Sequence, residues 1–477
     1  MKLSKLRIKN FRCFQDVEVD FNEKLTVFIA ENGQGKSTVL DAIRIGLWPF
    51  VSSFDAVTGT MSNSGIDVDD VHLARGKHRN MEPQLPARIE AVAKINGQPV
   101  YWARQRDKVS KGAKTTVKDA KPIAELGARL QEKIRMLAAD NTEHDSSLET
   151  PLPIVAYYGT GRLWKQRYLT LKNQSSSDFF SRTSAYVGCL DSGSDYKHFA
   201  DWFFYLYASD FEQKTKEMEA QGFSGLVNDR FVYADLMQAI RRPVDQVLGA
   251  LGWKHLSYSP SQKTLVMNHD DLGTLKVDQL SDGLKSMIAM TADIAYRCVR
   301  LNPYWSGNAV EKTTGVVMID EVDMHLHPRW QQVVLGQLQE AFPQVQFIVT
   351  THSPQVLSTT PAECIRILAS EWDEERDQQR IVVHPVSRQT QGVASSDLLA
   401  EIMGTDPLPN IEIVRQLSHY MALIQQDLES SDEAIQLRSL LEAHYGKHHP
   451  HMLECDRLIR LQALKRRKPA RRNEEGR

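Results

Sequence analysis

Cysteine is scarce in this sequence, long apolar runs are missing, and neither sign of charge is in marked excess. The 477 residues include five dispersed cysteines without paired spacing, so we expect neither a disulfide framework nor a zinc finger. No apolar stretch approaches the ~20 residues that span a bilayer, so we expect no membrane segment and no signal peptide. A formal net charge of −2 gives no global argument for nucleic-acid binding. These absences predict a globular cytoplasmic protein.

The strongest local signal is a glycine-rich loop close to the N-terminus. Residues 30–38 read Ala-Glu-Asn-Gly-Gln-Gly-Lys-Ser-Thr, after a β-prone apolar run and before a segment of helical spacing. A strand, such a loop and a helix N-terminus form an anion cradle, because backbone N–H groups and the helix dipole point at the phosphates. Ala30 replaces the usual first glycine, which is tolerable if its φ is negative. The residues expected to contact a nucleotide are Asn32, Gly33, Gln34, Gly35, Lys36, Ser37 and Thr38.

A pair of carboxylates is the second signal. The apolar run 316–319 is followed directly by Asp320 and Glu321. In phosphoryl transfer, the first acid of such a pair orders Mg²⁺ and the second polarises the attacking water. Together with the phosphate loop, this pair predicts an ATP site in which Lys36 reaches the β- and γ-phosphates and the Ser37 hydroxyl binds Mg²⁺. A buried strand with solvated acids at its end is the alternative, and the phosphate loop disfavours it.

Two shorter motifs complete the set. Residues 347–353 read Phe-Ile-Val-Thr-Thr-His-Ser, which places His352 at the carboxyl end of a strand, where α/β sheets bind ligands. Residues 280–284 read Leu-Ser-Asp-Gly-Leu before a helical segment, so Ser281 and Gly283 offer a hydroxyl and N–H groups to an anion. Each motif alone has a structural alternative. The fixed order of all four favours the ATP-binding-cassette class of ATPase.

These motifs, with Lys5-Leu-Arg-Ile-Lys-Asn-Phe-Arg-Cys-Phe at 5–14 and Asp-Glu-Val-Asp-Met-His-Leu-His-Pro at 320–328, resemble the SMC/Rad50/RecF/OLD group of ATPases. The resemblance extends to about residue 390. It implies an α/β head with a P-loop parallel sheet and N-terminal antiparallel strands, acting as a homodimer or higher homo-oligomer. Each ATP would lie between one subunit's phosphate loop and the other subunit's Ser281 and Gly283. Glu321 would be the catalytic base, assisted by Lys36, and His352 the switch histidine.

Within this group the chain looks most like the compact stand-alone ATPases of bacterial anti-phage defence, the PtuA type of Septu and retron-associated systems. The runs 153–164 and 401–405 carry this likeness. It implies a separate nuclease partner of HNH type (PtuB-like). Two alternatives stay open: a RecF/Rad50-like repair ATPase without a nuclease partner, and an OLD-like ATPase that carries its own nuclease. Helical spacing over 405–470, with no Asp-x-Asp run after His352, disfavours the OLD-like alternative.

Four regions are expected along the chain. Residues 1–160 and 253–390 form the two parts of the ATPase head, 161–252 an inserted helical lobe, and 391–477 a helical partner-docking region with a basic tail. Helices are expected near 410–427, 432–444 and 452–466. Sustained heptads are missing between the phosphate loop and 280–284, so we expect no long coiled coil.

Three local patterns have two interpretations each. ATPases of this group carry a glutamine ligand of Mg²⁺, and Arg162 either occupies its place or is a structural turn arginine. The run Asp323-x-His325-x-His327 has zinc-ligand residue types, but its position directly after the acid pair favours a loop that packs on a partner subunit. The basic segments 5–12 and 465–472 are either solvated or contact double-stranded DNA through its phosphates, which would make binding salt-dependent and blind to sequence.

Overall fold

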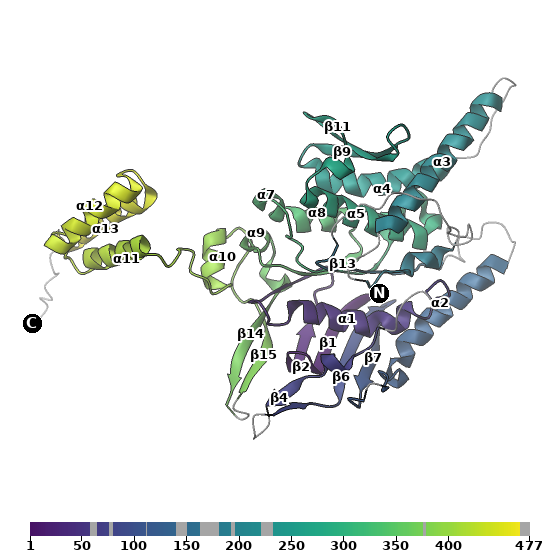
Figure 1. The fold of residues 1–477 in the computed structure, drawn as a ribbon, viewed down its shortest axis with the longest axis horizontal. Helices are drawn as coiled ribbons and strands as arrows, with labels where there is room; N and C mark the ends of the chain where they lie inside the picture. Colours follow the sequence, from purple (N-terminus) through teal and green to yellow (C-terminus); the bar gives the residue numbers. More distant parts are fainter. Residues whose placement is uncertain are drawn as a thin grey trace, which may run out of the picture. The chain divides into compact units, whose positions relative to one another are not determined.

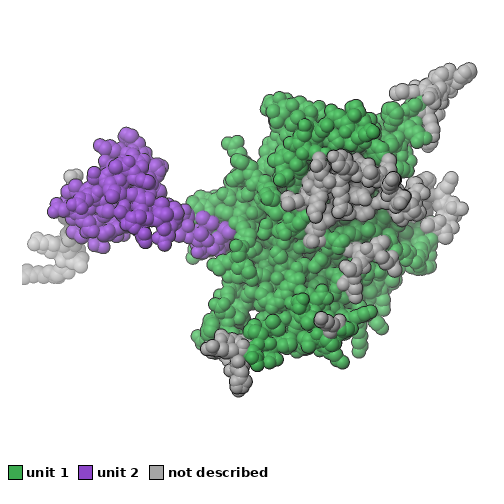
Figure 2. Space-filling model, in the orientation of Figure 1, with its two compact units in different colours: residues 1–398 green, residues 399–477 purple. Residues whose placement is uncertain are grey.

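The computed structural model describes residues 1–57, 64–75, 80–110, 112–139, 150–162, 181–191, 196–220, 232–374 and 378–467. The chain divides into two compact units, residues 1–398 and residues 399–477 (Figure 2). Over the described ranges, no helix combines the length and apolarity needed to cross a membrane.

A six-stranded sheet with the order β15-β14-β3-β13-β12-β8 forms the centre of the first unit. Its strands are β3 (Leu25–Ile29), β8 (Ile154–Tyr158), β12 (Gly315–Ile319), β13 (Val345–Thr350), β14 (Ile365–Asp373) and β15 (Gln378–Pro385). All neighbouring pairs are parallel except β14 with β15. β3, β8, β12 and β13 are buried at every position, as expected for a sheet covered on both faces. The predicted parallel P-loop sheet is confirmed.

Helix α1 (Lys36–Val51) lies on one side of β13, and α5 (Asp282–Leu301) and α8 (Val334–Ala341) lie on the other (Figure 1). α1 also packs on a four-stranded antiparallel sheet of order β2-β1-β6-β7, to which it is tied by a hydrogen bond from the Trp102 indole to the Gly46 carbonyl at 2.7 Å. The strands of this sheet are β1 (Lys2–Phe11), β2 (Phe14–Asp20), β6 (Ala87–Ile95) and β7 (Gln98–Arg106). The N-terminal antiparallel strands are thus confirmed. α2 (Lys121–Ala139) packs along α1.

Two long helices and a small sheet cover the α5 side of the first unit. α3 (Tyr196–Ala220) packs on α4 (Val232–Gly249), and both contact α5. The sheet has the order β11-β10-β9 and consists of β9 (Trp253–Ser259), β10 (Thr264–His269) and β11 (Gly273–Lys276). Sequence reasoning expected the helices but not this sheet. Short elements complete the unit: β4 (Leu73–Arg75), β5 (Met81–Pro83), α6 (Ala309–Lys312), α7 (Pro328–Gln331) and α9 (Pro354–Leu357), while α10 (Ser395–Glu401) spans the division between the units.

The second unit has its own apolar core. Its helices α11 (Glu412–Gln425), α12 (Asp432–Tyr445) and α13 (Pro450–Arg467) match the three expected from the sequence. They bury a shared cluster formed by Leu417, Tyr420, Leu423, Ile424, Ala434, Leu441, Met452 and Cys455. All members of this cluster come from the unit itself, so its packing does not require the head.

Candidate nucleotide-binding site

The phosphate loop has the backbone that its glycines predict. Gly33 and Gly35 adopt left-handed conformations with φ of 84° and 94°, a region that favours glycine. At Gly35 a Cβ would also lie 2.6 Å from Cζ of the Phe14 ring, whereas nothing lies within 4 Å at Gly33. Ala30 is not among the positive-φ residues in the described part of the chain. Its methyl group is therefore compatible with the loop.

Lys36 is the first residue of α1 and lies inside the loop. Its side chain is 7% exposed, and Nζ donates to the carbonyl oxygens of Ala30 at 2.9 Å and Glu31 at 3.2 Å. Ser37 follows with an exposed side chain. The cation is thus oriented toward the loop, as an anion cradle requires.

Two threonines at the end of β13 hold the acids that follow β12. Asp320 is 4% exposed. The Thr350 hydroxyl donates to Asp320 Oδ1 at 2.6 Å and accepts from the Glu321 N–H at 2.7 Å. The Thr351 hydroxyl donates to Asp323 Oδ1 at 2.5 Å. Adjacent parallel strands therefore position the acid pair through hydroxyl groups, which carry no charge.

Glu321 has a left-handed backbone conformation, with φ of 48°. For a residue with a side chain this costs roughly 1–2 kcal/mol, and such residues persist where the surrounding contacts enforce them. Thr350 holds the N–H side of Glu321, and Arg162 holds the carbonyl side. The Arg162 guanidinium donates to the carbonyl oxygens of Asp320 and Glu321, the latter at 2.6 Å. The residue with two interpretations in the sequence thus contacts the acid pair.

The same three carboxylates influence the pKa of both His352 and Lys36. Burial lowers the pKa of His352, the positive charge of Lys36 lowers it further, and Asp323, Glu321 and Asp320 oppose this. Burial also lowers the pKa of Lys36, and the three carboxylates again act in the opposite direction. The imidazole of His352 is therefore harder to protonate than that of a free histidine. These five groups, from the ends of strands β12 and β13 and from the start of helix α1, form one electrostatic cluster.

The start of α5 lies against the loop that follows Glu321. Ser281 is the N-cap residue of α5, and its exposed side chain makes no capping hydrogen bond. Gly283 is buried, and a Cβ there would lie 2.3 Å from the carbonyl oxygen of His325. Within its own chain, Gly283 thus permits a close approach of helix and loop. Its contact with a nucleotide of a partner subunit remains a prediction.

The residue types fit ATP and Mg²⁺. Left-handed glycines open the loop for phosphate oxygens, and Lys36 supplies a cation beside it. The Ser37 hydroxyl and the Asp320 carboxylate are hard oxygen ligands of the kind that Mg²⁺ prefers. These two residues would hold the metal.

In the Asp323-x-His325-x-His327 run, Asp323 and His327 form hydrogen bonds with different partners. Asp323 accepts from Thr351, and His327 Nδ1 accepts from the Arg329 N–H at 3.3 Å at the start of α7. Within the described ranges, no group of three or more His, Cys, Asp or Glu side chains is arranged to hold a metal. These contacts lie within the chain, and packing of the run on a partner subunit remains a prediction.

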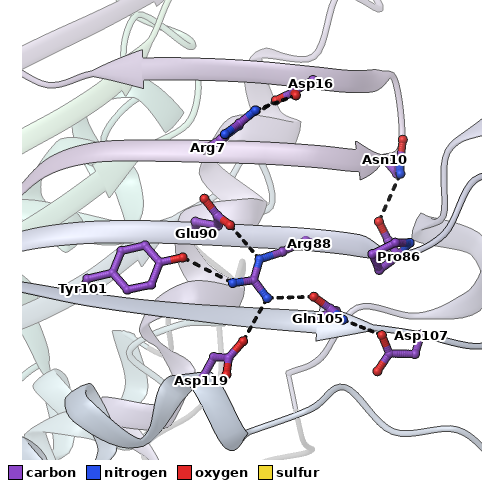
Figure 3. A network of polar contacts seen from close by, with 10 residues as sticks. All are labelled: Arg7, Asn10, Asp16, Pro86, Arg88, Glu90, Tyr101, Gln105, Asp107 and Asp119. Atoms are coloured by element: carbon purple, nitrogen blue, oxygen red, sulfur yellow. Dashed lines mark hydrogen bonds and ion pairs between the residues drawn. The ribbon is translucent and has the colours of Figure 1, made fainter.

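Ion pairs cover the outer face of the antiparallel sheet, where the basic strand lies (Figure 3). Arg7 pairs with Asp16 of β2 at 2.8 Å, and Lys5 pairs with Glu18 at 2.6 Å. Arg88 of β6 pairs in turn with acids of its own strand and of the segment 118–120 (Figure 3). This pairing weakens the argument for DNA contact at this strand. Most of the other basic segment, 468–472, lies outside the described residues.

Sequence reasoning missed the roles of Thr350 and Thr351 and left that of Arg162 open. The sequence signal for these roles is the position of the three residues at or shortly after the ends of apolar strands. A Thr-Thr pair immediately precedes His352, and Arg162 follows an apolar strand through a Gly-Thr-Gly turn. Only the strand order β13-β12-β8 brings these side chains to the acid pair.

Comparisons with known proteins agree with this geometry. A family model described as "AAA domain" matches residues 5–221, and one described as "AAA domain, putative AbiEii toxin, Type IV TA system" matches residues 139–358. The chain is 25% identical to the retron Ec83 probable ATPase of Escherichia coli, over 94% of this chain and 84% of that protein. It is 24% identical to the retron Vc95 probable ATPase of Vibrio cholerae serotype O1 biovar El Tor, over 93% of this chain and 88% of that protein.

More limited likenesses extend to two other proteins. The chain is 27% identical to the Septu protein PtuA of Bacillus thuringiensis, over 36% of this chain and 41% of that protein. A solved SMC head bound to the C-winged helix domain of ScpA is 14% identical with a TM-score of 0.44, over 81% of this chain and 98% of that chain. The two family models together span residues 5–358 and so include all four motifs.

Proposed function

We propose that this chain, an ATPase with the SMC-like ATP-binding-cassette fold, is the regulatory subunit of a bacterial anti-phage defence complex and controls a separate nuclease of HNH type. The ATPase part rests on one observation, the electrostatic cluster of Lys36, His352 and the carboxylates after β12. The defence part is supported by the likeness to two retron ATPases over 94% and 93% of the chain, and to a Septu PtuA.

Hydrolysis follows from the placement of the chain's own groups. Lys36 binds the β- and γ-phosphates, and Ser37 and Asp320 hold the metal. Glu321 accepts the proton of the attacking water, and His352 contacts the γ-phosphate at the end of β13. Mg²⁺ held by Ser37 and Asp320 would supply positive charge that stabilises the transferring phosphoryl group.

A second copy of the chain completes each site. Ser281 presents an exposed hydroxyl at the N-terminus of a 20-residue helix, where N–H groups and the helix dipole favour an anion. In this arrangement it faces the γ-phosphate bound by the partner. The protein then acts as a homodimer, or a higher homo-oligomer, through its ATPase heads.

The second unit is the proposed docking site for the nuclease. On α13, Leu453, Leu461 and Leu464 are 49%, 40% and 64% exposed. Their spacing places them on one side of the helix, and Arg457 and Arg460 lie between them in the sequence. A partner surface with apolar and acidic side chains matches this face. Helices α11–α13 are also unlike the alternating strands and helices of an appended nuclease domain.

Capture of a nuclease tests the proposal. The full chain serves as bait in its native host, and plasmid nicking is measured with and without the recovered partner. We expect an HNH nuclease to bind, nicking to require that partner, and Leu461→Glu to reduce capture while ATP hydrolysis persists. Ile435→Glu, at a position of α12 that is 57% exposed, is the matched control. An ATPase that binds DNA but captures no nuclease indicates the repair alternative, and Mg²⁺-dependent nicking by the chain alone indicates the OLD-like alternative.

A further inference from the structure

Arg162 lies at the end of the strand next to the acids. β8 pairs in parallel with β12, so that Tyr158 lies opposite Ile319, and the Asp320 N–H donates to the Tyr158 carbonyl at 2.8 Å. The chain then turns, with a hydrogen bond from the Arg162 N–H to the Gly159 carbonyl at 3.2 Å. This turn brings the arginine beside the acid pair.

The guanidinium of Arg162 binds main-chain oxygens. One terminal nitrogen donates to the carbonyl oxygens of Asp320 and of Gly159, the latter at 3.1 Å, and the other donates to the Glu321 carbonyl at 2.6 Å. The residue is 8% exposed. Two successive carbonyls can share one guanidinium in this way because the planar group carries donors in a rigid fork.

The guanidinium of Arg162 stabilises the left-handed conformation of Glu321. At φ of 48° the peptide after Glu321 is turned, so that its carbonyl and that of Asp320 both meet Arg162. Because the Cα–Cβ direction is fixed by the same backbone, this conformation also sets where the carboxylate begins. Thr350 holds only the opposite, N–H, side of Glu321.

Arg162 does not replace a glutamine ligand of the metal. A guanidinium has no acceptor atom, so it cannot bind Mg²⁺. Burial lowers the pKa of Arg162, and the negative charges of Asp320, Glu321 and Asp323 oppose this only in part, but a guanidinium stays protonated in proteins. The charge is therefore kept beside the acids while its hydrogen bonds go to the backbone.

We propose that Arg162 is a positioning residue, which fixes the backbone of Asp320 and Glu321 and so aims the Glu321 carboxylate at the water that attacks ATP. The inference rests on the proposed role of Glu321 in ATP hydrolysis. Arg162 touches neither substrate nor metal in this role, and it acts through the residue that does.

Arg162→Lys is the first test, since an ammonium keeps the charge but loses the planar fork. Arg162→Gln removes the charge as well and serves as the second variant. We expect kcat to fall about 10- to 100-fold, as misplacement of a catalytic group by about 1 Å does, while the Kd for ATP changes less than about 3-fold because the substrate contacts remain. Arg106→Lys is the matched control, because Arg106 is 4% exposed and also donates to main-chain carbonyls, those of Ile66 and Ser110. We expect Arg106→Lys to lower the stability of the protein without a selective fall in kcat at a nearly constant Kd for ATP.

A double-mutant cycle with Glu321→Gln separates failure of this inference from failure of the proposed function. Glu321→Gln alone should lower hydrolysis to a small residual rate, and wild-type hydrolysis by that variant refutes the assigned base. If the base is right, adding Arg162→Lys to Glu321→Gln should slow the residual rate by less than about 2-fold, because residues that act as a unit are not additive. Wild-type kcat in Arg162→Lys and Arg162→Gln, multiplicative effects in the cycle, or equal losses of ATP binding and hydrolysis would overturn the positioning role.

Discussion

Gly283 and the carbonyl group of His325 are in contact, so closely that a Cβ at position 283 would lie 2.3 Å from the oxygen and 3.1 Å from the carbon. His325 belongs to the loop that begins at Glu321, and it also has a left-handed backbone, with φ of 61°. The start of α5 and the loop after Glu321 thus touch within one subunit. We therefore expect a change in residues 280–284, here named the signature segment, to displace the acid pair of the same chain.

Gly283→Ala should impair hydrolysis by the subunit that carries it. The added methyl group meets backbone atoms, which cannot move aside as a flexible side chain does, so the loop must shift. We expect kcat to fall about 10- to 100-fold from displacement of Glu321, measured as steady-state ATP turnover. Gly336→Ala is the control, because Gly336 lies in α8 with no atom within 4 Å of an added Cβ. That variant should gain about 0.5–1 kcal/mol of stability, and equal turnover by both variants would contradict the argument.

Lys36→Ala should remove ATP binding, whereas Glu321→Gln should retain it and stop turnover. The first change deletes the cation of the phosphate loop, and the second deletes the group that takes the proton from water. Fluorescent-nucleotide titration and phosphate release separate the two effects. Lys5→Ala, on the outer face of the antiparallel sheet, is the control for loss of a lysine. The assignments fail if Glu321→Gln hydrolyses ATP at the wild-type rate.

Mixed subunits should reveal which residues act across the interface. A heterodimer of Lys36→Ala with Ser281→Arg keeps one site whose phosphate loop and signature segment are both intact, so part of the activity should return. A heterodimer of Lys36→Ala with Gly283→Ala should recover less, because Gly283→Ala also displaces Glu321 in the chain that keeps Lys36. Turnover after mixing is the measurement. A fully active monomer in sedimentation, or equal recovery in both mixtures, would be inconsistent with this model.

The pKa of His352 should rise when ATP binds. In the free protein, burial and the charge of Lys36 hold the pKa below its usual value of 6.5. The unfolded chain therefore takes up the proton first, and the contribution of His352 to stability is fully present above the unfolded pKa and is lost as pH falls toward the folded one. A γ-phosphate adds negative charge and favours the imidazolium.

NMR titration of ¹³C-labelled histidine in the Glu321→Gln variant, with and without ATP, measures this shift. His352→Gln assigns the resonance. His419, whose side chain is 52% exposed in the second unit, is the control, and its resonances should not respond to ATP. An unchanged His352 pKa in saturating ATP would remove the assigned contact with the γ-phosphate.

The local parts of this site could be predicted from sequence, because each is encoded within a few residues. Gly33 and Gly35 mark the loop, and two acids after a uniformly apolar strand mark the end of β12. Three C-terminal helices followed from their spacing in the same way. The interpretation of Ala30 as compatible with the loop agrees with its backbone.

The rest depends on which segments become neighbours. Arg162 reaches the acids only because β8 lies beside β12, and Thr350 because β13 lies on the other side. Strand order is set by long-range packing, which no local pattern records. The β9–β11 sheet was missed for a related reason: β9 is irregular, with a register shift in its pairing with β10, so it lacks the strict alternation that identifies a strand.

The C-terminal helices have their own core, so the segment that joins them to the first unit acts as a tether. Between the end of α10 at Glu401 and the start of α11 at Glu412 the chain has ten residues, which reach no farther than about 35 Å when fully extended. If a nuclease docks on α13 as proposed, the linker would keep it at an effective concentration on the order of millimolar around the ATPase head of the same chain. At such a concentration, even a weak contact between the proposed nuclease and the head would be occupied for much of the time. Cutting the chain at Pro407 would leave both partners folded and both activities intact, and only the coupling between them would be lost.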